Sequence, residues 1–230
     1  MLIFDCTQAA RDFFSGKVKG QVVTPVQPAA AAESLEFDSH DPADIQRWQL
    51  HATKFGKFNI LLAMKTDTRY AMLFVGLKRN DVDGFLERFR SRYIGELVKT
   101  ALQLQLPLPP QPVLQQCITD WENVLMDAHF FKRGDRGVQA HINDALGVAA
   151  YDAYEGRGLP TELNDLIAFD QATNDTLRSI KGGPYFQPAD EEIQRAYPRL
   201  GGVMAKEEVA EAYRAWHMAW HRQQSPGPSA

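Results

Sequence analysis

Three neighbouring runs of apolar and β-branched residues predict the strands of a sheet. Residues 48–55 are rich in strand formers, residues 58–64 are almost continuously apolar, and residues 69–75 form the third run. Gly56-Lys57 and Thr66-Asp67-Thr68 provide turn residues between them. Because these connections are short, we expect an antiparallel meander whose central strand is buried on both faces. The apolar residues 2–6 predict one more short strand.

Apolar residues with helical spacing predict a long helix at 81–105, which begins at the capping residue Asn80 or Asp81. Four prolines between 107 and 112 end this pattern. A short helix at 113–122 and a strand at 124–132 follow. Gly134-Asp135 then ends the strand and caps a second long helix at 136–154. A turn or two of helix is also expected at 8–14.

The C-terminal third has only helical patterns, at 162–180, 189–197 and 206–223. The predicted fold class is therefore α+β, an antiparallel β-meander packed with helices and followed by an all-helical C-terminal extension. We divide the chain into an α+β domain at 1–155, a helical extension at 156–223 that packs on it, and a disordered polar tail at 224–230. Prolines and acidic residues predict that 24–44 is a surface excursion.

The composition of the chain excludes several classes of function but does not indicate a particular one. The chain has 230 residues, a formal net charge of −4 and two cysteines. This charge argues against a protein that coats nucleic acid, and two distant cysteines cannot build a disulfide framework or a four-cysteine zinc site. The N-terminal residues lack the pattern of a signal peptide, and no apolar run is long enough to span a membrane. We therefore expect a cytoplasmic protein with no membrane partner.

A basic turn at 132–136 is the clearest candidate for binding an anion. It joins a predicted strand to a helix N-terminus, where unpaired N–H groups and the helix dipole attract negative charge. Lys132, Arg133 and Arg136 supply three cations there, although the spacing is not that of a Walker loop. The alternative is an ordinary capped basic turn.

Other polar groups offer weaker candidates for chemistry. His141 and Asp144 lie three apart on one predicted helix and could form an acid–base pair, with Asn143 beside them, but we find no nucleophile such as a Gly-x-Ser-x-Gly serine. Arg88, Arg92 and Lys99 form a ridge that could touch phosphate or simply face solvent. Asp170 and Asn174 fall near the inward face of the 162–180 helix. Either they form a polar contact between the C-terminal helices, or the face of this helix that points inward is a different one.

His217 and His221 have the spacing of two zinc ligands on one helix face. The residue after His217 is Met218 rather than the glutamate of the zincin pattern, and Glu211 and Tyr213 offer no third ligand. We therefore predict no metal site and no cofactor.

Two stretches carry a resemblance to a known family. The first is Trp48-Gln49-Leu50-His51-Ala52, then Thr66-Asp67-Thr68-Arg69-Tyr70 and Gly76-Leu77-Lys78; the second is Lys132-Arg133-Gly134-Asp135-Arg136-Gly137, then His141-Ile142-Asn143-Asp144. Over residues 1–155 the chain resembles a bacterial family known as a domain of unknown function, numbered about 6933. Three positions depart from the family's pattern. His51 is displaced from the position directly after the tryptophan, Lys65-Thr66 precedes Asp67 in place of an asparagine, and Gly137 replaces a serine. The resemblance implies no activity, but it raises Asp67, Arg69, Asp135, Arg136, Asn143 and Asp144 as candidates.

The resulting expectation is a non-catalytic binding module whose contact surface combines the turn at 132–136 with Arg69 and Asn143. An anionic small molecule or an acidic protein is the expected partner. The alternative is an enzyme acting on a phosphorylated or nucleotide-like small molecule, with His141 and Asp144 as its acid–base pair. A weaker alternative is local nucleic-acid contact.

Overall fold

The structure is a computed structural model that describes residues 1–31 and 45–224. Its main sheet has six strands in the order β4-β8-β1-β5-β6-β7. The strands of this sheet are β1 (Leu2–Cys6), β4 (Val26–Pro28), β5 (Gln46–Phe55), β6 (Phe58–Lys65), β7 (Ala71–Val75) and β8 (Ala128–Lys132). Two small hairpins lie outside it, formed by β2 (Gly16–Val18) with β3 (Gln21–Val23) and by β9 (Arg178–Ser179) with β10 (Tyr185–Phe186).

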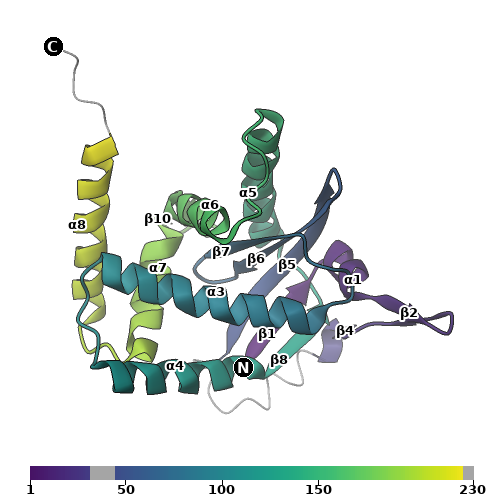
Figure 1. The fold of residues 1–230 in the computed structure, drawn as a ribbon, viewed down its shortest axis with the longest axis horizontal. Coiled ribbons are helices and arrows are strands. Elements are labelled where there is room, and N and C mark those ends of the chain that lie inside the picture. Colours follow the sequence, from purple (N-terminus) through teal and green to yellow (C-terminus); the bar gives the residue numbers. More distant parts are fainter. Residues whose placement is uncertain (32–44, 225–230) are drawn as a thin grey trace.

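The helices occupy both sides of the main sheet (Figure 1). They are α1 (Gln8–Phe14), α3 (Val82–Gln103), α4 (Gln111–Met126), α5 (Arg136–Tyr154), α6 (Leu163–Asp175), α7 (Pro188–Ala196) and α8 (Lys206–Gln224), with a 3-10 turn at Tyr197–Leu200. The chain is thus α+β with a mainly helical C-terminal portion, as the sequence predicts. None of the helices in the described ranges is long and apolar enough to cross a membrane.

The predicted antiparallel meander is present as β5, β6 and β7. The rest of the sheet was not expected, because β1 pairs in parallel with both β5 and β8, and β4 pairs in parallel with β8. The strand predicted at 124–132 begins only at Ala128, since α4 continues through Val124 to Met126. A parallel partner requires a long crossover, and residues 7–127 provide it between β1 and β8.

Alternate residues of β6 pack into two different cores. Leu61 and Ala63 face a core that contains α3, whereas Ile60, Leu62 and Met64 face one that contains α5 and α6. Burial on both faces explains the continuous apolar run in the sequence. The first core is dominated by aromatic rings, and those of Phe4, Phe85, Phe89, Trp48 and Tyr93 pack edge to face against one another.

Two segments differ from the predicted elements for identifiable reasons. The prolines near residue 26 do not keep it out of the sheet, because β4 is an edge strand, where a missing N–H is tolerated. The helix predicted at 162–180 ends at Asp175, and the turn containing Gly182, at φ +80°, allows the β9-β10 hairpin instead. The predicted acidic excursion at 32–44 and the tail beyond residue 224 lie outside the described residues.

Side chains of α6 cover the exposed edge of the sheet. Asn174 accepts a hydrogen bond from the backbone of Ala71 and donates one back to its carbonyl, while Asp170 accepts one from Leu73 N–H. Asp170 also pairs with Arg92 of α3. Asp170 and Asn174 therefore take the place of a seventh strand along β7, rather than joining the C-terminal helices to one another.

Candidate functional site

The α5 N-terminus and the β6-β7 hairpin meet at one end of the sheet. Asp135 caps α5 by accepting a hydrogen bond from Val138 N–H, and its own N–H donates to the side-chain oxygen of Gln49 on β5. Arg69 occupies the hairpin in the left-handed region, at φ +60°. A Cβ added to Gly137 would lie 3.9 Å from Nη2 of Arg69, which shows how closely the arginine approaches the first turn of the helix.

The basic turn itself is mostly directed at solvent. Lys132 and Arg136 are exposed, and Asn143 is exposed and accepts a hydrogen bond from Gln139. Arg133 is half-buried and lies 3.7 Å from a carboxylate oxygen of Asp5. The structure thus brings Arg69 to the base of this turn, as the sequence interpretation requires, but it leaves Asn143 on the surface of α5.

A buried basic cluster lies beside the turn and contains Arg69, His141 and Arg178. We call these three residues the arginine–histidine cluster. Arg69 and Arg178 are only 5% and 7% exposed, and burial lowers the pKa of each guanidinium. Burial also lowers the pKa of His141, and the charges of Arg178 and then Arg69 lower it further. His141 is therefore neutral at neutral pH and lies within electrostatic reach of both arginines.

The hydrogen bonds of this cluster are incomplete within the part of the chain that the structure describes. Nε and Nη1 of Arg69, Nε of Arg178 and Nδ1 of His141 are buried and have no partner there. A buried donor without a partner costs about 1–3 kcal/mol, so each calls for an explanation. Single buried donors without a partner also occur elsewhere in the described chain, at Arg92, Trp48 and Trp121, whereas this cluster gathers several of them. Arg178 was not identified from the sequence, because a lone arginine at the end of a predicted helix carries no signal.

His141 and Asp144 do not form the expected pair. Asp144 lies 3.4 Å from Nη1 of Arg178, its side chain is 68% exposed, and Nδ1 of His141 has no partner among the described residues. The carboxylate therefore does not orient the imidazole for acid–base catalysis. It acts instead as a weakly held counterion of the cluster.

An open cleft of about 810 Å³ adjoins the cluster between α5 and α6. Arg178 and Asp144 line it at one side, and the apolar side chains of Val148, Leu159 and Phe169 line its wall. Arg69 and His141 do not line this cleft. A cleft of this size suits a small organic molecule.

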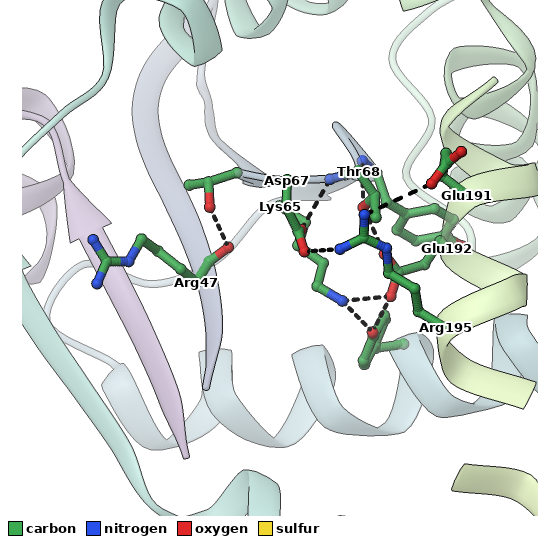
Figure 2. A network of polar contacts seen from close by, with 10 residues as sticks. Arg47, Lys65, Asp67, Thr68, Glu191, Glu192 and Arg195 are labelled. Atoms are coloured by element: carbon green, nitrogen blue, oxygen red, sulfur yellow. Dashed lines mark hydrogen bonds and ion pairs between the residues drawn. The ribbon is translucent and has the colours of Figure 1, made fainter. Parts of the chain in front are cut away.

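A second polar network, centred on Glu192 of α7, has its hydrogen bonds satisfied (Figure 2). Glu192 is fully buried and accepts hydrogen bonds from Lys65 at 2.8 Å, from Thr68 at 2.5 Å and from Tyr93. Burial, and then the charge of Glu192, raise the pKa of Tyr93. Each of the side-chain groups named here has a partner within the network. The network therefore fastens α7 to the sheet and provides few free donors or acceptors for a ligand.

Asp67 and Arg92, the latter one of the three residues of the predicted ridge on α3, also have structural roles. Asp67 accepts a hydrogen bond from Thr68 N–H and pairs with Arg195 of α7, which holds the hairpin against that helix (Figure 2). Arg92 is 8% exposed, donates to the carbonyl of Leu73 and pairs with Asp170. It therefore lies inside the protein rather than on a solvated ridge, and it is not placed to touch phosphate.

The fold and the cluster together describe an α+β protein with a mixed sheet, helices on both faces and a buried basic group at one sheet end. The chain belongs to the family described as "Domain of unknown function (DUF6933)", whose model matches residues 3–191. The resemblance found in the sequence is thus confirmed, and the match continues past residue 155 to include α6, Arg178 and the start of α7. Searches among curated proteins and among solved structures gave no match.

Proposed function

We propose that the protein is a binding module for an anionic small molecule, with the arginine–histidine cluster as its anion site. The observation that carries this proposal is the set of buried, unpartnered N–H groups on Arg69 and Arg178, together with Nδ1 of His141. Phosphate and carboxylate oxygens are the acceptors that match guanidinium donors best. The nearby N-terminus of α5 adds a favourable dipole.

Asp144 controls access to this site. The unpartnered nitrogens have no solvent-exposed surface, so an anion reaches them only if a neighbouring group moves. Asp144 is exposed and contacts Arg178 at 3.4 Å, which is a weak surface interaction that a ligand anion can replace. The body of the ligand would then occupy the cleft between α5 and α6, whose wall is apolar.

The choice of a small molecule over an acidic protein rests on shape. The cluster is buried beside a concave cleft, whereas a protein partner would be bound by the exposed residues Lys132 and Arg136. Binding without catalysis is favoured because His141 and Asp144 are not paired and because the sequence offers no positioned nucleophile.

The proposal is tested by titrating the protein with phosphate, pyrophosphate and sulfate at constant ionic strength, using calorimetry. Arg69→Met and Arg178→Met each remove charge-assisted hydrogen bonds of about 1.5–3 kcal/mol, so each should weaken binding by roughly 10- to 100-fold. Lys132→Met and Arg136→Met are matched controls that remove exposed cations nearby. They should change the affinity by less than about threefold, because exposed charges are screened.

The opposite pattern would contradict the proposal. If Lys132→Met or Arg136→Met abolishes binding while Arg69→Met and Arg178→Met retain it, the exposed turn is the anion site. If all four variants bind like the wild type, neither surface binds these anions specifically.

A further inference from the structure

The ends of α6 and α8 bring two histidines and one aspartate together. Asp175 is the last residue of α6, and His217 and His221 lie one turn apart on α8. Nε2 of His217 is 2.8 Å from Oδ1 of Asp175, and Nε2 of His221 is 3.5 Å from Oδ2. The two imidazole Nε2 atoms are 3.0 Å apart. Asp175, which lies 42 positions before His217 in the sequence, thus supplies the third ligand that α8 itself does not offer.

Polar atoms crowd Nε2 of His217. Nε2 of His217 is in contact with three polar atoms, namely Oδ1 of Asp175, Nε2 of His221 and Nε2 of Gln187, the last at 2.8 Å. An imidazole nitrogen carries either one lone pair or one N–H in the ring plane, so it makes one well-directed hydrogen bond. Nε2 of His217 therefore makes one well-directed hydrogen bond, and its other two polar neighbours crowd it, although Gln187 also donates to Oδ1 of Asp175 and Tyr213 donates to the same oxygen.

A metal cation at the centre of Asp175, His217 and His221 would relieve the crowding among these three side chains. Each imidazole and the carboxylate would then direct a lone pair at the cation rather than at one another. Tetrahedral ligands at 2.0–2.1 Å from a metal are about 3.3 Å apart. Nε2 of His217 lies 2.8 Å from Oδ1 of Asp175 and 3.0 Å from Nε2 of His221, and the latter lies 3.5 Å from the other carboxylate oxygen, Oδ2. The ligand atoms all lie within 4.8 Å of one another.

We propose that Asp175, His217 and His221 form a site for a divalent transition metal of the zinc class. Imidazole and carboxylate donors suit Zn²⁺ and its late first-row neighbours, and three protein ligands leave one position for water. The side chain of His221 is 54% exposed, so the site is accessible from solvent. Bound metal would join α6 to α8.

Neighbouring side chains hold the three ligands in place. Tyr213 donates a hydrogen bond to Oδ1 of Asp175 at 3.1 Å, and its ring stacks on that of His217. Burial, and then the charge of Asp175, raise the pKa of Tyr213, so it remains a donor. Such second contacts orient metal ligands in known sites. This site does not depend on the anion site, since α6 presents Asp175 on a different side from the residues that line the α5-α6 cleft.

The test uses the full chain without an affinity tag, treated with a chelator and then titrated with Zn²⁺ by calorimetry and with Co²⁺ by visible absorption. We expect one equivalent of each metal to bind, a tetrahedral Co²⁺ spectrum and a higher melting temperature with Zn²⁺. His221→Gln and Asp175→Asn should each weaken binding at least about tenfold, because even residues that only orient metal ligands contribute that much.

His129→Gln is the matched control. His129 is a half-buried histidine that lies 2.7 Å from the carboxylate of Asp127 and has no second imidazole within that pair. This variant should bind metal like the wild type. The proposal is overturned if the wild type binds no metal, if it gives only the octahedral spectrum of aqueous Co²⁺, or if His129→Gln weakens binding as much as His221→Gln does.

Discussion

Two buried arginines in this protein should respond in opposite directions to the same substitution. Arg69 has two buried nitrogens with no partner in the described chain. Arg92 has one, Nε, but it pairs with Asp170 and Glu96 and donates to the carbonyl of Leu73. Methionine keeps much of the apolar stem of arginine and removes the guanidinium in both cases. The comparison between Arg69→Met and Arg92→Met therefore isolates the effect of hydrogen-bond pairing.

The magnitudes follow from the contacts. Each unpartnered donor costs about 1–3 kcal/mol, and attraction to Asp135 and Asp67 offsets part of this cost for Arg69. Arg69→Met should thus raise the free energy of unfolding by roughly 1–2 kcal/mol, or about 2–8 °C in melting temperature. Arg92→Met leaves two buried carboxylates without their cation and should lower the free energy of unfolding by about 3–5 kcal/mol.

The assay is urea unfolding at pH 7 in Tris chloride, since phosphate and sulfate would occupy the proposed site. The lowered pKa of Arg69 agrees with the expected direction, because the folded state disfavours the charged form of this side chain. If Arg69→Met destabilises the protein as much as Arg92→Met does, then Arg69 has a structural partner and the reasoning about its unpaired donors is refuted.

Three further predictions test other parts of the account. Asp144→Asn removes the carboxylate that competes at Arg178 and should tighten pyrophosphate binding about two- to tenfold by calorimetry; weaker binding would mean that Asp144 helps to hold the ligand. The pKa of His141 is lowered in the folded state, so the unfolded chain gains a proton first as the pH falls below about 6.5, and stability is lost there. His141→Gln should make that loss shallower in urea titrations from pH 7 to pH 5, and an unchanged slope would exclude His141 as its source. Glu192→Leu strands the ammonium of Lys65 in the interior and should cost about 3–5 kcal/mol in urea unfolding, while adding Lys65→Met should recover most of it; no recovery would show that the cost is not electrostatic.

The sequence predicts the local elements well because they follow from periodicity and caps. The helix at Arg136–Tyr154 matches its predicted range, and Asp135 caps it as expected. The parallel pairing of β1 and β8 could not be predicted in the same way, because it depends on contacts between residues more than 120 positions apart. An apolar run such as 124–132 fits either a helix end or a strand, and only packing decides between them.

The candidate site was predicted only in part, and for a related reason. Arg69 was identified because the resemblance to the family includes the hairpin that contains it, and the α5 N-terminus because turn and cap residues leave a local signal. Arg178 and Asp175 have no such signal, since each becomes important only when α6 and the β9-β10 hairpin pack against elements far away in the sequence. The sequence of α8 shows no third ligand for His217 and His221, because Asp175 lies on α6 and meets them only in the folded chain.

The central claim is that the arginine–histidine cluster binds an anion, and the pKa of His141 measured by NMR tests it most directly. Without ligand this pKa should lie below 6.5, since burial and both arginines lower it. Saturating pyrophosphate should raise it, because an anion between the arginines favours the charged imidazolium, and Arg178→Met should remove most of that rise. A pKa of His141 that pyrophosphate leaves unchanged, under conditions where the protein binds pyrophosphate, would contradict the account.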